Sequence, residues 1–381
     1  MKSSILPVTK NFEETILNFL KEGLDKNCFE AVIIPKRVPS GDSFAYLLIK
    51  DKSILEGSSP MPPVIPVQGA KAISSLTRRG NVKKKILAIM HPCEIRATIE
   101  LFKLKQASLE NLIFLSFDCP GVMPLSEYLE NPERSDQTYQ ETFQKWESGN
   151  MRPVCQICTE FSAPASDLHL GLLGADEGKV FLIPTTPEGE QIMDTLGLKM
   201  DNSLDQQETE VKKLKKEREN KRSKVHQTLQ TQVKGPERLL ETFSQCINCH
   251  NCMRVCPVCY CRQCYFDSDA FKLAPDNFIR RAEKKRSLRL PTDTLLFHLG
   301  RMSHMILSCV SCGTCEDACP MSIPVAQVFS LVADKTQQLF NYVPGRSKEE
   351  PLPTVVYQEE ELQEVEMPYS ETYVKVEEKN A

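Results

Sequence analysis

Seven cysteines lie within the nineteen residues CINCHNCMRVCPVCYCRQC (246–264), and this run constrains the fold of the chain more than any other feature. The first four follow the spacing Cys-x2-Cys-x2-Cys-x3-Cys-Pro, which returns unchanged in CVSCGTCEDACP (309–320). Clustered cysteines are metal ligands or redox centres in a reducing compartment, whereas disulfide scaffolds belong to secreted and usually much smaller chains. The segment MKSSILPVTKNFEET (1–15) lacks the apolar stretch and cleavage site of a secretory signal, so we expect a cytoplasmic protein with metal-bound thiolates.

The repeated spacing is typical of ferredoxin-type ligands of a 4Fe-4S cluster. Such a cluster needs four thiolates, three from a tight loop and a fourth from the segment that leaves it, and in two-cluster ferredoxins the fourth cysteine binds the other cluster. Zinc is the competing metal, but zinc-binding pairs rarely repeat in this form. The two predicted ligand sets are Cys246, Cys249, Cys252 and Cys319 for one cluster, and Cys309, Cys312, Cys315 and Cys256 for the other.

Length and composition restrict the class of protein. A chain of 381 residues favours two domains, and 41% hydrophobic with 26% charged residues is typical of a soluble globular protein. The net charge of −4 argues against nucleic-acid binding through bulk charge. No apolar run approaches the roughly 20 residues that span a bilayer, so no membrane span is expected.

The first half predicts an α/β domain with a mostly parallel sheet, followed by a mainly helical two-cluster ferredoxin domain. Short apolar runs rich in β-branched and aromatic residues alternate with helical patterns such as EIRATIELFKLKQ (94–106), an order that favours parallel strands. The expected strands are 29–35, 44–49, 84–90, 111–117 and 179–184. A charged helix is expected over 204–233. The expected division is an α/β domain (1–200), a charged linking helix (201–238), a helical dicluster ferredoxin domain (239–346) and an acidic C-terminal tail (347–381).

Four further cysteines have an informative placement. Cys93 and Cys119 each follow an expected strand, so parallel pairing would bring both thiols to the carboxyl edge of the sheet. Cys155 and Cys158 form a Cys-x2-Cys pair. From spacing alone these four are either a third cluster site or buried structural cysteines, which are common.

The same residues carry a family resemblance. A cysteine after one strand, Asp-Cys after the next, a Cys-x2-Cys-x8-Asp segment and then a Lys/Glu-rich helix resemble the beta subunit of coenzyme F420-reducing hydrogenase. Joined to a two-cluster ferredoxin region, they resemble the beta subunit of F420-linked formate dehydrogenase. The segments RLPTDTLLFHLGRMSHM (289–305) and CPMSIPVAQVFSLVADKTQQLFNYVPGRS (319–347) add to a likeness that covers roughly residues 80–360.

The resemblance implies an iron-sulphur flavoprotein. It places a third 4Fe-4S cluster on Cys93, Cys119, Cys155 and Cys158, beside a non-covalent FAD that couples a two-electron hydride carrier to one-electron clusters. The flavin is expected to draw on two glycine-bearing segments and on two residues that flank Cys93, which can equally be a structural histidine and a surface arginine. The expected flavin-binding residues are Gly69, Lys71, His91, Arg96, Asp167, Gly171 and Gly174.

Two departures concern the flavin and the hydride carrier. Hydrogenase members of the family carry a Gly-Gly pair in an N-terminal helix, and NFEETILNFLKEGLDK (11–26) has none. Gly-x-Gly-x-x-Gly is absent as well, so no dinucleotide-binding fingerprint supports NAD. The carrier is therefore coenzyme F420, NAD(P)H, ferredoxin or only another subunit.

Cys259, Cys261 and Cys264 are not needed by either ferredoxin motif. They predict either a further metal site or a shell around the neighbouring cluster. A fourth ligand would be drawn from Cys28, His250, His298 or His304, although Cys28 fits a core position better. The basic run FIRRAEKKRSLRL (278–290) and the acidic tail are each either a docking segment for a partner or an ordinary solvated face.

Three functions fit these features. The first is an oxidoreductase subunit that passes electrons between a hydride carrier and a partner, either a dehydrogenase or hydrogenase catalytic subunit or a heterodisulfide-reductase-type subunit. Formate or hydrogen oxidation would then occur on another chain, and no catalytic residue is assigned here. The second is a flavin-free electron-transfer linker, and the third an iron-sulphur scaffold. Bound FAD separates the first two.

Overall fold

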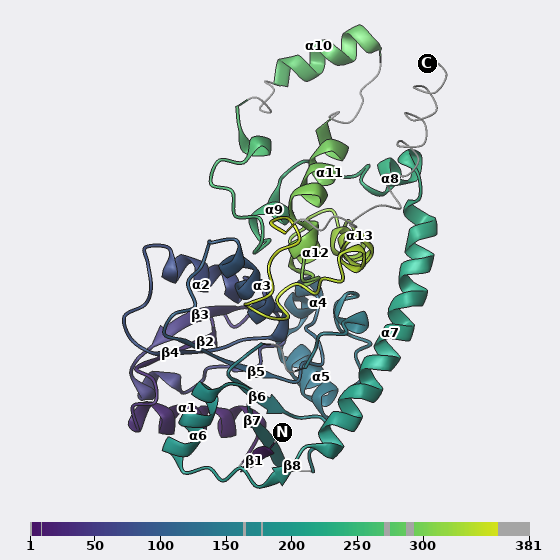
Figure 1. Cartoon of the computed structure of the whole chain (residues 1–381). Helices are drawn as coiled ribbons and strands as arrows, with labels where there is room; N and C mark the ends of the chain where they lie inside the picture. Colours follow the sequence, from purple (N-terminus) through teal and green to yellow (C-terminus); the bar gives the residue numbers. More distant parts are fainter. Residues whose placement is uncertain are drawn as a thin grey trace, which may run out of the picture.

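A computed structural model describes residues 2–8, 10–162, 165–176, 178–269, 275–286 and 293–356. An α/β part and a helical part lie against each other, and the 29-residue helix α7 (Asp205–Val233) runs along the side of both (Figure 1). This helix is the one expected over residues 204–233. None of the helices in the described ranges combines the length and the apolar character that crossing a membrane requires.

Eight strands of the described chain form one sheet in the order β3-β2-β4-β5-β6-β7-β1-β8. Strands β2, β4, β5 and β6 pair in parallel, whereas β3 on one side and β7, β1 and β8 on the other pair antiparallel. The expected α/β class is confirmed, but the sheet is mixed and parallel pairing is confined to its centre. The bounds are β1 Lys2–Pro7, β2 Ala31–Arg37, β3 Phe44–Ile49, β4 Ile86–Ile89, β5 Leu112–Phe117, β6 Leu168–Gly171, β7 Lys179–Pro184 and β8 Asn202–Ser203.

Helices cover both faces of this sheet. Along β4 the side chains alternate: Leu87 and Ile89 pack in the core with α1 and α6, while Ile86 and Ala88 pack with α2 and α3 (Figure 1). This alternation of buried residues on both faces is why the central strands are continuously apolar. The helices of this part are α1 Phe12–Asp25, α2 Gly69–Thr77, α3 Pro92–Lys103, α4 Leu125–Glu130, α5 Pro132–Lys145 and α6 Pro187–Leu196, with 3-10 turns η1 Lys52–Leu55 and η2 Cys155–Ile157.

The helical part has a core of its own. Phe243, Phe297 and Phe329 are fully buried in it, together with the partly or fully buried cysteines of both ferredoxin motifs. Its helices are α8 Pro236–Thr242, α9 Asn251–Arg254, α10 Pro275–Lys285, α11 Asp293–Met305, α12 Thr314–Asp317 and α13 Val325–Leu339, with 3-10 turns η3 Tyr265–Asp267 and η4 Ile306–Ser308.

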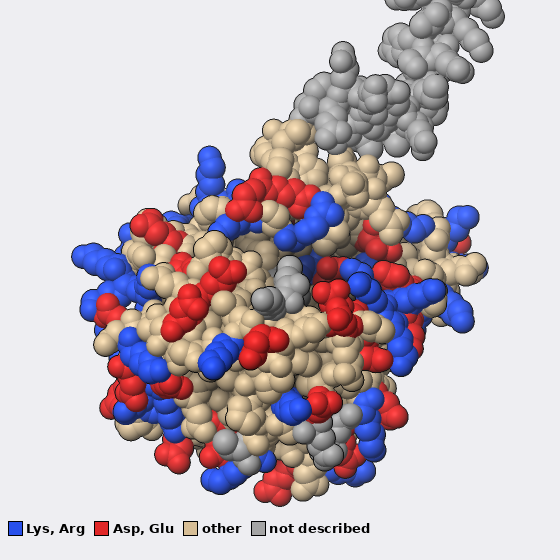
Figure 2. All heavy atoms as spheres, turned by 60° about the horizontal axis from the view of Figure 1, so that its bottom comes forward, with Lys and Arg blue, Asp and Glu red and all other residues tan. Residues whose placement is uncertain are grey.

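Two charged segments lie partly outside the described residues. The basic run expected to be helical is helix α10 up to Lys285, and its residues 287–290 are not described. Of the acidic tail, residues 357–381 are likewise outside the description. On the face shown in Figure 2, cationic and anionic side chains are interspersed rather than gathered by sign.

Candidate metal centres

Four cysteines of the α/β part line one pocket. Strands β4 and β5 are adjacent and parallel, so Cys93, at the start of α3, and Cys119, just after β5, lie at the same edge of the sheet. The turn η2 brings Cys155 and Cys158 to the same place, and the four residues line a pocket of about 400 Å³. The strand-end cysteines therefore meet the Cys-x2-Cys pair, as the sequence predicts.

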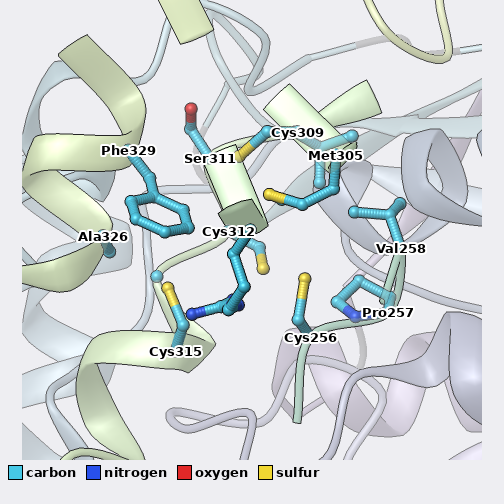
Figure 3. A pocket seen from close by; sticks show the side chains of 13 residues that line it. Cys256, Pro257, Val258, Met305, Cys309, Ser311, Cys312, Cys315, Ala326 and Phe329 are labelled. Carbon is cyan, nitrogen blue, oxygen red and sulfur yellow. The ribbon is translucent and has the colours of Figure 1, made fainter. Parts of the chain in front are cut away.

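The two ferredoxin motifs line two more pockets, and each motif lends one cysteine to the other. One pocket, of about 390 Å³, has the thiols of the second motif and of Cys256 directed toward the same space (Figure 3). The other, of about 320 Å³, contains three cysteines of the first motif together with Cys319. We name the pockets by their cysteines: pocket A (Cys93, Cys119, Cys155, Cys158), pocket B (Cys256, Cys309, Cys312, Cys315) and pocket C (Cys246, Cys249, Cys252, Cys319).

Both ferredoxin loops use the same backbone device. The residues just before and just after the middle cysteine have positive φ: Asn248 (57°) and His250 (61°) in one loop, Ser311 (55°) and Gly313 (83°) in the other. Left-handed residues on both sides of a cysteine turn the loop sharply, which lets three nearby thiols face one side. The loops are thus matched in conformation as well as in spacing.

Gly313 offers a test of this loop geometry. A Cβ there would lie 2.9 Å from Arg152 Cδ and 2.9 Å from Val154 Cγ2, in addition to its φ of +83°. We expect Gly313→Ala to lower both the urea midpoint and the retained iron. Gly41→Ala is the matched control, because Gly41 has the same φ with nothing within 4 Å, and it should cost only about 1–2 kcal/mol for the left-handed backbone. Equal losses of stability and iron in both variants would contradict this role.

The donor chemistry of the pockets fits iron-sulphur clusters. Burial raises the pKa of Cys155 to about 11 and that of Cys309 to about 12, so these thiols resist ionisation without a cation beside them. A cluster supplies that positive charge through its irons, and soft thiolates are the ligands it prefers. One buried nitrogen atom beside pocket A also lacks a hydrogen bond. His91 lines this pocket, and its Nε2 has no hydrogen-bond partner among the described residues.

Hydrogen-bond donors reach the thiols of pocket C from α11. His298 Nε2 lies 3.4 Å from Cys246 Sγ, and one turn later Arg301 donates from Nη1 to Cys252 Sγ at 3.1 Å. Burial lowers the pKa of His298 to about 3, so its imidazole is neutral. Hydrogen bonds to cluster sulphurs are one of the means by which a protein sets cluster potentials. A His-x2-Arg spacing ahead of the second motif was the sequence signal for this pair, and it was missed.

Pockets A and B are neighbours across the contact between the two parts. Ser311 and Cys312 line both pockets. Arg152, only 2% exposed, donates to the carbonyl oxygens of Cys312 at 2.9 Å and Ile65 at 3.0 Å, and forms an ion pair with Asp317. The second motif is therefore fastened directly to the edge of the sheet.

Further hydrogen bonds and ion pairs hold the same interface. Glu100 accepts hydrogen bonds from Tyr342 Oη at 2.5 Å and from the Gly345 amide at 2.8 Å. Asp334 on α13 contacts Arg222 at 2.7 Å and His226 at 3.2 Å on α7. The two parts are thus held in one orientation by contacts from three segments that are distant in sequence.

Helix α7 also contributes a buried arginine to pocket A. Arg218 donates to the carbonyl oxygens of Pro120 at 3.0 Å and Cys158 at 3.3 Å, and its guanidinium lies 4.6 Å from the ring centre of Phe161. Together with Gln207, His226 and Leu229 it makes up the buried face of this helix. The strongly basic sequence around Arg218 indicates a solvated helix, so the burial of this residue is not apparent from the sequence.

The expected flavin residues do not gather in one pocket. Around α2 and α3, the Gly69 amide donates to Glu94 Oε1 at 2.6 Å, and Lys71 donates to the Arg254 carbonyl. His91 is the N-cap residue of α3 and forms a capping box with Glu94. Arg96, which donates from Nε to the Pro344 carbonyl at 2.8 Å, faces the interface.

The remaining three lie just before β6, at its last residue and after it. Asp167 accepts from the Phe114 amide at 2.8 Å and from Thr186 Oγ1 at 2.9 Å, and Gly171 and Gly174 pack against the start of α7. Each of these residues has a structural contact of its own. Asp118, which the sequence reasoning did not single out, organises this region, since its carboxylate accepts from the Leu172 and Leu173 amides at 2.8 and 3.0 Å.

One further pocket lies between the two parts. It measures about 720 Å³, and its polar lining includes Arg96, Glu160, Arg222 and Asp334. Cys158 of pocket A and Cys309 of pocket B also line it. We call it the interdomain pocket.

The three additional cysteines do not converge. Cys259 hydrogen-bonds with Cys256, Cys264 Sγ lies 3.5 Å from Met253 Sδ, and Cys261 is exposed. Within the described ranges, no group of three or more His, Cys, Asp or Glu could hold a single metal ion.

The candidate fourth ligands also lie apart from these cysteines. His250 pairs with Asp267 at 2.9 Å, His298 contacts Cys246, His304 is exposed and Cys28 packs against the core of the sheet.

Comparison with known proteins gives two kinds of relative. Residues 242–323 match the family model described as a 4Fe-4S dicluster domain. The F420-dependent formate dehydrogenase subunit beta of Methanocaldococcus jannaschii is 27% identical over 69% of this chain and 74% of its own length. F420-dependent formate dehydrogenase 1 subunit beta of Methanococcus maripaludis is 28% identical over 70% and 74% respectively.

A solved chain is also similar in part. It comes from the xenon-derivatised F420-reducing [NiFe] hydrogenase complex of Methanosarcina barkeri, with 12% identity and a TM-score of 0.43 over 61% of this chain and 92% of that one. No inference below rests on it. The chain is therefore similar over about 70% of its length to the beta subunits of F420-dependent formate dehydrogenases, and its residues 242–323 match a 4Fe-4S dicluster domain.

Proposed function

We propose that this chain is an iron-sulphur flavoprotein beta subunit that passes electrons between a hydride carrier and a partner subunit. One observation carries the proposal: twelve of the sixteen cysteines line three pockets, and pockets A and B share Ser311 and Cys312. Pockets A, B and C each hold a 4Fe-4S cluster on their four thiolates. Clusters alone do not select a substrate, so their arrangement supports electron transfer rather than a chemical step on formate or hydrogen.

The order of the relay follows from the shared residues. Ser311 and Cys312 line both A and B, and Arg301 lines B while it donates to Cys252 of C. Electrons therefore move along A–B–C, in either direction. Pocket A faces the α/β part and pocket C lies in the helical part, so the two ends of the relay serve different partners.

FAD is proposed at the α/β end, where it supplies the conversion between two-electron hydride transfer and one-electron cluster reduction. The interdomain pocket is the site that we favour, because its lining is polar and because Cys158 and Cys309 form part of its wall. Arg96 is the one expected flavin residue that lines it. Gly69, Lys71, His91, Asp167, Gly171 and Gly174 lie elsewhere, and their contacts offer this site no further support.

Coenzyme F420 is the proposed hydride carrier, since both formate dehydrogenase relatives are named F420-dependent. NAD(P)H is the alternative. The proposed partner is a catalytic dehydrogenase or hydrogenase subunit or a heterodisulfide-reductase-type subunit, with formate or hydrogen oxidised on that chain. Anaerobic reduction of the purified protein with reduced F420, NADH and NADPH in turn tests the carrier, and cluster reduction by none of the three would contradict the proposal.

Flavin content tests the cofactor assignment. Denaturation of the purified protein should release about one flavin per chain, and Arg96→Ala should weaken flavin retention by about tenfold or more, the loss expected for a charge-assisted hydrogen bond. Arg134→Ala, at an exposed position of α5, is the control and should keep its flavin. A protein with full iron content and no flavin would instead indicate an electron-transfer linker without flavin.

A further inference from the structure

Arg301 lies between the two ferredoxin pockets. It is only 2% exposed and lines pocket B, while its Nη1 and Nη2 donate to Cys252 Sγ and to the Cys252 carbonyl oxygen, both at 3.1 Å. The rings of Phe329 and Phe297 lie 4.9 and 5.7 Å from its guanidinium. One side chain of α11 therefore touches the ligand sphere of pocket C and the wall of pocket B.

The charge of Arg301 has no carboxylate counterpart in the described part of the chain. Among the other buried arginines, Arg152 pairs with Asp317, whereas Arg218 donates to the carbonyl oxygens of Pro120 and Cys158. The charged groups that act on Arg301 are Cys252 of pocket C, Cys256 and Cys315 of pocket B, and the adjacent Cys259. Its Nε has no hydrogen-bond partner among the described residues. A buried cation without an anion costs several kcal/mol, so the anion expected here is the thiolate-ligated cluster on each side.

We propose that Arg301 is the shared counter-charge of the clusters in pockets B and C, and that it raises the reduction potentials of both. This inference rests on the proposed function, because it requires clusters in those pockets. In each transfer one cluster would lose an electron, and the cluster that accepts it would become more negative by one charge. A fixed cation stabilises that reduced state, and the hydrogen bond to Cys252 Sγ adds to the effect in pocket C. The guanidinium stays protonated throughout, so no proton moves with the electron.

Arg301 is accordingly a positioning residue for electron transfer and not a catalytic one. Its charge acts on two clusters at once, so it should raise the reduction potentials of both. Arg152 lies in the corresponding place between pockets A and B, but Asp317 neutralises it.

The test is an EPR-monitored redox titration of the full-length, cluster-loaded protein. In Arg301→Gln, two of the three cluster midpoints should fall, each by at least the shift that makes the reduced-to-oxidised ratio tenfold lower at a fixed potential, about 59 mV for a one-electron couple. The midpoint of the cluster in pocket A should stay in place. Arg254→Gln is the matched control, because Arg254 follows Cys252 closely on α9 but its side chain is 65% exposed, and its midpoints should be those of the wild type.

Three results would overturn the proposal or separate it from the proposed function. Unchanged midpoints in a fully loaded Arg301→Gln protein overturn it. If that variant loses its clusters, Arg301→Lys decides: the lysine keeps the charge but not the two hydrogen bonds to Cys252, so only the midpoint of the cluster in pocket C should fall, and a fall of both midpoints would overturn the proposal. A wild-type protein without cluster signals in the helical part would instead refute the proposed function itself.

Discussion

Replacing Cys155 and Cys158 together with serine is expected to lower the iron content from about twelve to about eight atoms per chain, because one of three clusters loses half of its ligands. Reduction of the two remaining clusters by the hydride carrier should stop as well, since pocket A begins the relay. Iron analysis of the anaerobically purified protein measures the first effect. Cluster absorbance after addition of the reduced carrier measures the second.

Cys28→Ser and Cys261→Ser are the matched controls for this experiment. Cys28 packs against the core of the sheet and Cys261 is exposed, and neither lines one of the three pockets. Both should keep about twelve irons. If the double variant keeps its full iron content and its electron transfer, the α/β part is a domain that is joined to a ferredoxin without taking part in electron transfer. A wild-type value near sixteen would point to a further cluster involving Cys259, Cys261 and Cys264.

Arg152→Ala is expected to destabilise the contact between the two parts by about 3–5 kcal/mol, because it leaves Asp317 buried without its partner. Asp317 is only 9% exposed at its side chain, and Arg152 2%. The variant also removes the hydrogen bonds to the carbonyls of Cys312 and Ile65. The measurement is the urea midpoint of the cluster-loaded protein, followed through the fluorescence of its single tryptophan, Trp146.

Two variants show whether the buried charge is the cause. Arg152→Met combined with Asp317→Leu removes both charges and keeps much of the volume, so it should restore most of the lost stability. Lys213→Ala breaks an exposed pair with Glu210, with side chains 63% and 41% exposed, and should change stability by less than about 0.5 kcal/mol. A loss in Arg152→Ala no larger than in Lys213→Ala would contradict the ionic account of this interface.

The cysteine sets were predictable because metal ligation leaves a local spacing in the sequence. Three thiols within seven residues can face one side of a loop whatever surrounds the loop. Both motifs achieve this with residues of positive φ on each side of the middle cysteine. The strand-end pair needed one more step: Cys93 and Cys119 meet only because β4 and β5 are neighbours in parallel. The strands themselves were visible as apolar runs, so this step also followed from sequence patterns.

The edge of the sheet was less visible. Strand β1 holds its place by pairing with β7 and β8, as Ser4 with Leu182 and Ser3 with Asn202. Its sequence KSSILP has too few apolar residues to indicate a strand by itself, and β6 is only four residues long. Such strands form because partners distant in sequence supply the hydrogen bonds, which no local pattern encodes.

The flavin residues show the limit of transferring residues by resemblance. Gly69 and Lys71 are among the expected flavin residues, but the Gly69 amide donates to Glu94 and a Cβ at Gly69 would lie 2.7 Å from Met90 Cε. Asp167 binds the Phe114 amide instead of facing a pocket. Only the packed structure reveals that these donors and acceptors already have partners.

The sequence by itself determined which thiols act together, because the reach of a thiolate along a short loop is set by covalent spacing. It also determined the α/β and helical halves, through the periods of their apolar residues. Only the tertiary structure decided where buried charge lies. Arg152, Arg218 and Arg301 are three among forty-seven lysines and arginines, and nothing in the residue type distinguishes these buried arginines from the exposed basic residues. Whether a cation is solvated or enclosed between sulphur ligands depends on chain segments that meet only on folding. The burial of the cation in turn decides how strongly its charge stabilises a transferred electron.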